Sequence, residues 1–239
     1  MPQTVSAVSL TRQELFSAVR ALQPRVAVFD CDGTLWSGDA GSSFMRWTME
    51  TGLLCPEKTA ALNQRYEQYR NGEVSEAAIC GEMVQCYAGL RETEMREAAK
   101  VFFAEQIESK IFPEMRELLQ ELQRDGVDLW AVSSTNDWVI EEGVSRFALP
   151  ANRVLAARVA VDDGLVTERL LDVPTDEGKV ASLLQAKILA PDAVFGNSVH
   201  DAAMLAIARR AFPINPSAAL IERSANEGWA VYFPEGIRR

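Results

Sequence analysis

Six polar side chains in this sequence could act together in chemistry: Asp30, Asp32, Ser133, Lys179, Asn197 and Asp201. Three of them are carboxylates, and two carboxylates about 4 Å apart repel each other by roughly 4 kcal/mol at an effective dielectric of about 20. A hard divalent cation removes that penalty, and Mg2+ prefers one or two carboxylates together with water and phosphate oxygens. Lysine and serine hydroxyls suit a phosphoryl group. The residue types therefore predict a Mg2+ site beside a phosphoryl group.

Each of these residues also has a simpler structural interpretation. The run DCDGT at 30–34 could be a surface turn, because Asp and Gly favour turns. The serines at 133 and 134 could cap a following helix, Lys179 could be a solvated helix lysine, and Asn197 with its neighbour could cap another helix. The turn is the weakest of these alternatives because a buried strand precedes it. The joint position of the residues beside successive strand ends favours one shared site.

Strands must bring these residues together. Residues 25–29 (RVAVF) are a short apolar run, rich in β-branched residues, which predicts a strand buried on both faces. We expect further strands at 127–132 and 193–195, with helices between them. Strands that alternate with helices predict βαβ units and a parallel sheet. Ligands bind at the carboxyl ends of the strands in such a sheet, which is where the polar residues follow.

The remaining elements follow from periodicity and from turn residues. A capping box at Thr11–Glu14 opens a helix that runs to about Leu22. Other helices are expected at 114–125, 136–147, 176–189, 199–208 and from 217, strands at 211–214 and 229–233, and a strand hairpin at 154–161 and 165–170.

Residues 36 to about 111 differ in character from the rest. They are dense in Glu, Gln, Arg, Met and Ala, and they predict helices at 40–52, 56–70, 75–88 and 92–109, separated by Gly and Pro. We therefore predict an α/β domain formed by 1–35 and 112–239, interrupted by a helical domain at 36–111.

The composition limits the partners. The net charge is −10 and there is no basic block, so we expect no nucleic acid partner and no binding to an anionic membrane. No stretch approaches the roughly 20 apolar residues of a membrane-spanning helix. Residues 1–10 lack the pattern of a secretory signal, and a cytoplasmic location is our expectation. We expect a monomer or a homodimer.

Four short motifs follow one another along the chain: FDCDGTL at 29–35, AVSSTND at 131–137, GKV at 178–180 and GNSVHD at 196–201, with a tail that contains NPS at 215–217 and GW at 228–229. In these segments and their order the chain resembles the haloacid dehalogenase-type phosphohydrolases, and within them the phosphoserine-phosphatase-like branch. The resemblance covers nearly the whole chain. It implies a doubly wound parallel-sheet, Rossmann-like α/β core with an inserted all-helical cap of the C1 type that selects the substrate.

The resemblance also implies an activity and roles for the residues. It predicts a Mg2+-dependent phosphomonoester hydrolase that acts on a small phosphorylated metabolite through an aspartyl-phosphate. Asp30 would be the nucleophile. Asp32 would protonate the leaving oxygen and then activate water. Ser133 and Lys179 would hold the transferring phosphoryl oxygens.

The metal and substrate ligands are less closely specified. The resemblance places the metal on Asp30, the backbone carbonyl of Asp32 and the fourth motif, where the usual Gly-Asp is Gly196-Asn197. An amide oxygen can still bind Mg2+ but lowers the charge of the site by one, so Asn197 and Asp201 are both candidate metal ligands. The candidates for substrate binding are Gly33, Thr34, Ser134, Asn136 and Asp39.

The cap departs from a phosphoserine phosphatase. In that branch a Glu after the first motif and an Arg in the cap grip the amino acid; here the first position corresponds roughly to Asp39 and the second falls at Met83. This argues against phosphoserine as the substrate. Arg46, Glu76 and Glu82 are nearby polar residues among which the sequence does not choose. Trp36 and Trp47 are candidates for the pocket lining, although the cap core is the favoured place for Trp47.

Other functions remain as alternatives. A dehalogenase would lack the second acid, because a halide needs no proton when it leaves, and Asp32 is present. A phosphotransferase or phosphomutase shares these motifs and differs in what attacks the intermediate. A non-catalytic protein that binds a phosphorylated ligand would need no nucleophile. His200, the one histidine in the sequence, is expected to lie at the surface or behind the site rather than to act as a base.

Overall fold

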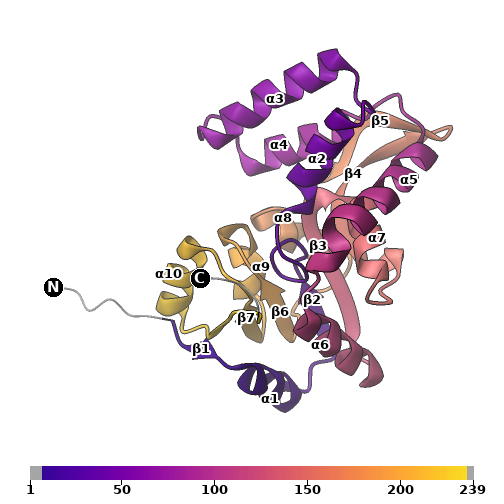
Figure 1. Cartoon of the computed structure of the whole chain (residues 1–239). Coiled ribbons are helices and arrows are strands. Elements are labelled where there is room, and N and C mark those ends of the chain that lie inside the picture. The colour runs from indigo at the N-terminus through magenta and orange to yellow at the C-terminus, as the bar shows by residue number, and fades with distance from the viewer. Residues whose placement is uncertain (1–6, 236–239) are drawn as a thin grey trace.

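A mixed β-sheet forms the centre of the molecule. The computed structural model describes residues 7–235. Within that range the main sheet has six strands in the order β5-β4-β3-β2-β6-β7, and all neighbouring pairs except β4–β5 are parallel (Figure 1). The strands are β2 (Val26–Phe29), β3 (Asp128–Asn136), β4 (Val154–Asp162), β5 (Leu165–Asp172), β6 (Ala193–Gly196) and β7 (Arg210–Pro213).

Helices cover both faces of this sheet, as a doubly wound fold requires. One hydrophobic cluster joins Ala27 and Phe29 of β2 to α1, α6 and α7, and a second joins Val28 to α8, α9 and α10. Successive side chains of β2 thus point to opposite faces, and both faces are apolar. These core helices are α1 (Arg12–Leu22), α6 (Pro113–Arg124), α7 (Asp137–Ser145), α8 (Glu177–Gln185), α9 (Ala202–Ala206) and α10 (Ala218–Glu227).

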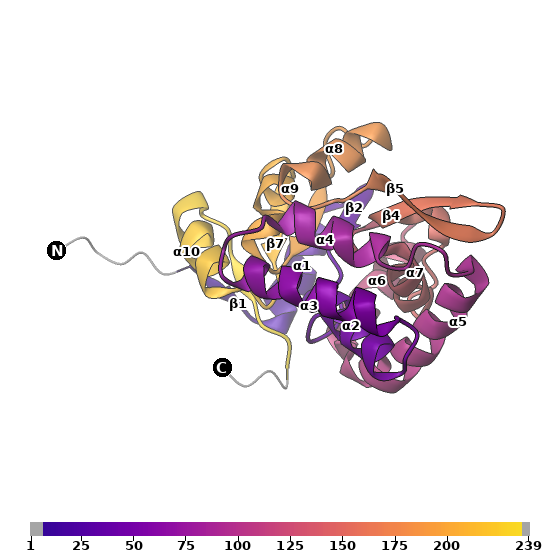
Figure 2. The same ribbon diagram turned by 90° about the horizontal axis from the view of Figure 1, so that it is seen from above.

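The helical segment is inserted between β2 and α6. It contains α2 (Ala40–Glu50), α3 (Pro56–Arg70), α4 (Glu76–Gln85) and α5 (Glu92–Phe102), followed by a π-helical turn (Phe103–Ile107) and a 3-10 turn (Glu108–Lys110). Seen from above, α2, α3 and α4 lie over the carboxyl ends of the central strands (Figure 2). The predicted inserted helices are confirmed, but the helix expected at 92–109 changes type at Phe103, and the widened turn leaves both Phe102 and Phe103 buried.

The hairpin β4–β5 ties the helical segment to the sheet. The backbone N–H of Gly89 donates to the Val166 carbonyl at 2.8 Å, and that of Glu92 donates to the Gly164 carbonyl at 3.0 Å. The residues that follow α4 therefore pair with the hairpin instead of packing only among themselves. The sequence predicted the hairpin, but it did not predict that the hairpin would pair with the residues that follow α4.

Other expectations need correction at their ends. The strand expected at 127–132 runs on to Asn136, and the helix expected to reach residue 189 ends at Gln185. The helix expected at 199–208 is a 3-10 turn (Val199–Asp201) followed by the short α9. The strand expected at 229–233 is β8 (Val231–Tyr232), which pairs in parallel with β1 (Ser9–Leu10), a strand that the sequence did not suggest.

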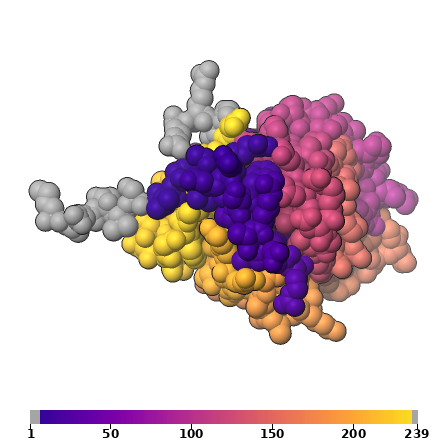
Figure 3. Space-filling view, turned by 90° about the horizontal axis from the view of Figure 1, so that it is seen from below, coloured from indigo at the N-terminus to yellow at the C-terminus, as the bar shows by residue number. Residues whose placement is uncertain are grey.

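The two ends of the described chain lie side by side at the base of the core. Figure 3 shows the indigo N-terminal segment between the yellow C-terminal elements and the magenta surface that includes α6. Arg20 of α1 bonds to Glu121 of α6 at 2.5 Å, and the buried Glu114 accepts from the Tyr232 hydroxyl at 3.1 Å. Among residues 7–235, no helix combines the length and apolarity that crossing a membrane would need.

Candidate active site

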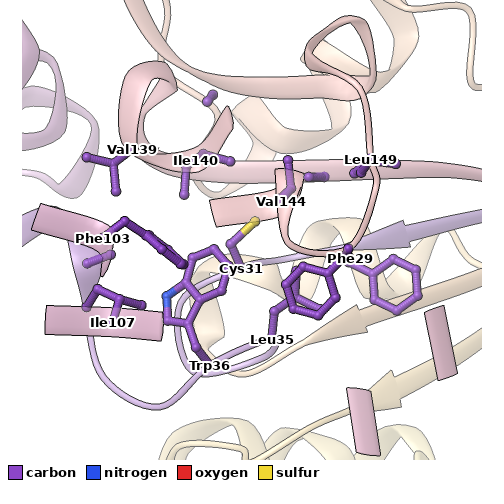
Figure 4. Close-up of a cluster of buried hydrophobic side chains, with 14 of the residues drawn as sticks. Phe29, Cys31, Leu35, Trp36, Phe103, Ile107, Val139, Ile140, Val144 and Leu149 are labelled. Carbon is purple, nitrogen blue, oxygen red and sulfur yellow. The ribbon is translucent and has the colours of Figure 1, made fainter. Parts of the chain in front are cut away.

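The loop after β2 rests on a tightly packed apolar cluster. Cys31, Leu35 and Trp36 are all fully buried between β2, α7 and the π-helical turn (Figure 4). The N–H groups of Thr34 and Leu35 both donate to the Cys31 carbonyl, at 3.1 and 2.8 Å, which folds the loop into a tight turn. These apolar side chains point into the core, and the acids between them are left to face the sheet edge.

Asp30 lies at the centre of the site. The residue is 5% exposed, its Oδ2 accepts from the Thr34 hydroxyl at 2.9 Å, and its Oδ1 accepts from Lys179 Nζ at 2.8 Å. Burial, and then the charge of Asp201, raise the pKa of Asp30 to about 6, while Lys179 and Thr34 act against that rise. Near neutral pH this carboxylate is mostly ionised, and two donors hold it at the floor of the site.

Lys179 neutralises two buried carboxylates. Its Nζ donates to Asp30 Oδ1, to Asp201 Oδ1 at 2.5 Å and to the Val132 carbonyl at 3.2 Å, which uses all of its protons. Burial acts to lower the pKa of Lys179, but the charges of Asp201 and Asp30 outweigh it and hold the pKa above its usual value. The ammonium is therefore a permanent positive charge between the two acids.

Asp32 has a different environment from Asp30. Its Oδ1 accepts from the Trp36 indole N–H at 2.6 Å and from the Ala40 backbone N–H at 2.7 Å, and its Oδ2 accepts from the Thr135 hydroxyl at 2.7 Å. Burial, and then the charge of Asp39, raise the pKa of Asp32 to about 7. No lysine or arginine in residues 7–235 pairs with it. It is thus the acid of the pair that can carry a proton near neutral pH.

Asp201 organises the loop after β6. Its Oδ2 accepts from the backbone N–H groups of Asn197 and Ser198 at 2.8 and 2.9 Å, while its Oδ1 is bonded to Lys179. A Cβ on Gly196 would lie 2.7 Å from the Asp201 Cβ, so glycine is needed for this close approach. Asp201 is 1% exposed and does not line the cavity described below.

Asn197 faces the opposite loop. Gly33 has a φ of 73°, and a Cβ there would lie 1.8 Å from Asn197 Nδ2, so the amide packs directly on the glycine. Asn197 lines the cavity together with Asp30 and Asp32. The available donors here are a carboxylate, a side-chain amide and backbone carbonyls, and these oxygen donors fit Mg2+. Residues 7–235 contain no cluster of three or more His, Cys, Asp or Glu side chains that could hold a metal ion, so a cation at this site would depend partly on amide and carbonyl oxygens.

An irregularity in β3 supplies the third side of the site. The register of β3 against β4 shifts between Ser133 and Asn136, which breaks the usual alternation of side chains. All four residues from 133 to 136 line one cavity. Ser133 is 2% exposed and accepts from the Thr135 N–H at 3.1 Å, and Asn136 caps α7 by accepting from the Val139 N–H at 3.0 Å. The helix cap is therefore Asn136 and not either serine.

These groups open into a cavity of about 470 Å3 between core and cap. The core contributes the polar floor, and α3 and α4 contribute the facing wall. The wall consists of Tyr66, Tyr69, Glu76, Ile79, Cys80, Met83 and Val84. This size suits a small metabolite.

Most of the predicted site residues lie on this cavity. Asp30, Asp32, Ser133, Lys179 and Asn197 line it, and so do Gly33, Asp39, Ser134 and Asn136. Thr34 does not: it is fully buried, and its hydroxyl is bonded to Asp30. Trp36 is also fully buried and does not reach the cavity, because its indole N–H binds Asp32 from the core side.

The roles of several residues were not anticipated. Thr135 and Trp36 hold Asp32, Asn215 donates to the Gly33 carbonyl at 3.3 Å, and Tyr66 and Tyr69 form part of the cap wall. Thr135 and Asn215 lie in segments that carry the family resemblance, and Trp36 was considered only as a pocket residue, whereas nothing in the sequence had pointed to the two tyrosines. His200 lines the cavity edge with its Nδ1 2.8 Å from Asp176 Oδ1, away from Asp30.

Comparison of the sequence with known protein families leads to the same set of motifs. Residues 27–206 match the model of the haloacid dehalogenase-like hydrolases, which includes all four motifs. The chain belongs to this family. The match spans β2 through α9 and so contains both the sheet edge and the inserted helices.

Individual relatives are more distant. The chain is 26% identical over 216 residues to a histidinol-phosphatase of Neisseria meningitidis serogroup C (strain 8013), a match that covers 86% of this chain and 97% of the relative. A protein of unknown function from Bordetella pertussis Tohama I has a similar structure, with a TM-score of 0.77, 23% identity, and 87% and 97% of the two chains covered. A phosphoserine phosphatase captured with a phospho-aspartyl intermediate analogue has a TM-score of 0.58 at 18% identity, over 87% of this chain and 92% of that one. The structural matches show a shared fold.

Proposed function

We propose that this hydrolase is a Mg2+-dependent phosphatase that cleaves phosphomonoesters of a small metabolite through a covalent phosphate on Asp30. The observation that carries the proposal is the inequality of the two acids after β2. Asp30 is paired with Lys179, whereas Asp32 has only neutral donors and a pKa raised to about 7. A nucleophile and a proton donor are the two groups that this reaction needs.

The proposed reaction has two half-steps. Asp30 attacks phosphorus while the bond from phosphorus to the ester oxygen breaks, and Asp32 gives its proton to the departing alcohol. Asp32, now ionised, takes a proton from water, which attacks the aspartyl-phosphate and releases inorganic phosphate and free Asp30. Ser133 lies buried on the cavity floor, where its hydroxyl is suited to hold a phosphoryl oxygen. Lys179 lies on the same floor and would contribute its positive charge to the transferring phosphoryl group while it stays bonded to Asp30 and Asp201.

The proposed metal site consists of Asp30, the backbone carbonyl of Asp32 and the Asn197 side chain. Asp201 has both oxygens engaged with Lys179 and the 196–198 loop, so it supports the site from behind. When bound, Mg2+ supplies positive charge that stabilises the transferring phosphoryl group. Binding would also favour the ionised form of Asp30.

We further propose that residues 36–111 act as the cap that selects the ester, over a core formed by 1–35 and 112–239. The relative with the name histidinol-phosphatase makes histidinol phosphate the first ester to test. A phosphotransferase would form the same Asp30 intermediate and pass the phosphate to an alcohol. Hydrolysis is favoured because Asp32 can activate water after the alcohol has left.

The test is a comparison of wild type with Asp30→Asn on small phosphomonoesters, with and without Mg2+. We expect release of inorganic phosphate only with wild type and Mg2+, and a loss of at least about 1,000-fold in the variant. Asp163→Asn, an exposed change at the tip of the β4–β5 hairpin, is the matched control. Equal activity in Asp30→Asn would contradict the proposal, and phosphate transfer to added alcohols without net hydrolysis would favour the transferase.

A further inference from the structure

The cap wall of the cavity carries an acidic residue, Glu76, that has no role in the proposed transfer of phosphate. Glu76 is the first residue of α4, and its side chain is 16% exposed. Its Oε1 is 3.6 Å from the Cys80 thiol, and its Oε2 is buried with no hydrogen-bond partner in the described part of the chain. A buried carboxylate oxygen without a donor is costly, so its retention on a cavity wall points to a ligand that supplies the donor.

The surroundings of Glu76 suit a positive group. Tyr66 and Tyr69, whose ring centroids are 5.8 Å apart, line the same wall of the cavity as Glu76. Burial, and then the interaction of its hydroxyl with the Glu76 carboxylate, raise the pKa of Tyr69, although the hydroxyl does not reach normal hydrogen-bond geometry with Glu76 Oε2. Carboxylates and aromatic faces together attract organic cations.

The cavity has no free cation for a substrate carboxylate. Of the described residues that line it, Lys179 is the one lysine or arginine, and its protons are already used by Asp30, Asp201 and Val132. His200 Nε2 is 3.8 Å from Glu76 Oε2, and its Nδ1 is bonded to Asp176.

The other two polar cap residues that were candidates from the sequence, Arg46 and Glu82, do not line the cavity. Arg46 is exposed and bonds to Ser43, while Glu82 pairs with Arg65 at 2.6 Å outside the cavity. Met83 lines the cavity, and the family resemblance places at Met83 the arginine that grips the amino acid in phosphoserine phosphatases. The structure thus selects Glu76 from the three candidates that the sequence left open.

We infer that Glu76 is a specificity-determining residue that binds a cationic nitrogen of the substrate, and that the natural ester carries such a nitrogen and no carboxylate. This rests on the proposed phosphatase function and names its substrate class: phosphate esters of amino alcohols. Histidinol phosphate belongs to that class, since it has an amine and an imidazole but no carboxylate. Phosphoserine does not, because its carboxylate would meet Asp32, Asp39 and Glu76 without a free cation.

The experiment compares three sets of esters on the magnesium-loaded enzyme. Aminoalkyl phosphates of graded length and histidinol phosphate carry the cation, alkyl phosphates of matched length lack it, and O-phosphoserine adds a carboxylate. We expect kcat/KM for the best cationic ester to exceed those of its neutral isostere and of O-phosphoserine by about tenfold or more, as for one charged hydrogen bond.

Two variants then assign the preference to Glu76. Glu76→Gln should lower the ratio of kcat/KM for the cationic ester to that for its neutral isostere by about tenfold. Glu73→Gln removes the same charge from an exposed position three residues away and should leave the ratio unchanged. Met83→Arg should raise kcat/KM for O-phosphoserine relative to phosphoethanolamine.

The outcomes separate this inference from the proposed function. If no ester releases phosphate, the phosphatase proposal itself is wrong. If all esters are hydrolysed with similar kcat/KM, or if Glu76→Gln leaves the ratio at the wild-type value, the phosphatase proposal stands and the role of Glu76 is refuted.

Discussion

Asp30 and Asp32 are one residue apart in the chain, yet the fold places them in different chemical settings. Asp30 is bonded to an ammonium and a hydroxyl, whereas Asp32 is bonded to an indole, a backbone amide and a hydroxyl. The pKa of Asp30 is raised to about 6 and that of Asp32 to about 7. Asp30 contacts a positive charge and Asp32 does not, which suits the first to be the ionised nucleophile and the second to be the proton donor.

Asp32→Asn tests the proton transfer. p-Nitrophenyl phosphate has a leaving group that needs no proton, so Asp30 should still be phosphorylated, while hydrolysis of the aspartyl-phosphate should slow by roughly 100-fold to 10,000-fold. We expect a burst of nitrophenolate equal to the enzyme concentration, followed by slow turnover, in stopped-flow absorbance. Alkyl phosphates should show no burst. A variant that turns over both esters at the wild-type rate would exclude Asp32 as the acid.

Asn197 should weaken the metal site relative to a carboxylate. We expect Asn197→Asp to tighten Mg2+ binding by roughly tenfold, because it adds a charge at a position that lines the cavity. Titration of phosphatase activity against free Mg2+ measures this, and calorimetry gives a second value. Asn63→Asp adds the same charge on the exposed part of α3 and should change nothing. Unchanged affinity in Asn197→Asp would remove Asn197 from the proposed ligands.

At the scale of elements, the sheet and most helices were predictable because each has a local signal. The buried strand at 25–29, the capping box at Thr11 and the glycine-bounded cap helices were all found from spacing and composition. Ends of elements were less predictable, since packing sets them. β3 extends past its apolar run because a register shift against β4 keeps it paired, and β1 exists because β8 is beside it.

Gly143 of α7 packs closely against two aromatic rings, one at each end of the inserted segment. A Cβ on Gly143 would lie 2.6 Å from the Phe103 ring and 2.8 Å from the Trp36 ring. Gly143→Ala should therefore lower the free energy of unfolding by about 1–3 kcal/mol. It should also lower kcat/KM, because Trp36 orients Asp32. Urea unfolding and steady-state assays measure both effects.

The control for this change is Ser145→Ala, on the exposed side of the same helix, which should shift stability by about 0.5 kcal/mol or less. Equal stability of Gly143→Ala and wild type would show that the two rings can move apart without cost.

For the molecule as a whole, Lys179 joins parts of the chain that are far apart in sequence. It bonds β2 through Asp30, β3 through Val132 and the loop after β6 through Asp201, and it is 2% exposed. Its removal would leave two buried carboxylates facing each other in a chain that already carries a net charge of −10. The effect should therefore be on global stability and not only on activity.

Lys179→Met should lower the free energy of unfolding by about 3–5 kcal/mol near neutral pH. Without the ammonium, which acts to lower it, the pKa of Asp30 rises further above its value in the unfolded chain. The folded state then binds more protons than the unfolded state, so stability falls as pH rises and is partly regained at about pH 5. Urea unfolding of metal-free protein at several pH values tests this.

Lys100→Met, an exposed lysine of the cap, is the control and should show the wild-type pH dependence. A destabilisation of Lys179→Met that is independent of pH would indicate lost packing and not unpaired charge.

The sequence alone determined the family, the edge of the sheet that carries the site, and the acids at that edge. Each strand and the motif that follows it are adjacent in the sequence, so they can be found from local patterns. Only the tertiary structure decided what surrounds those acids. Thr135 reaches Asp32 across 103 positions of sequence, and Lys179 reaches Asp30 across 149. It also chose Glu76 over Arg46 and Glu82 as the polar residue on the cavity wall. Contacts between residues that are distant in sequence depend on how the helices pack over the sheet. The spacing of residues within a short segment does not predict that packing.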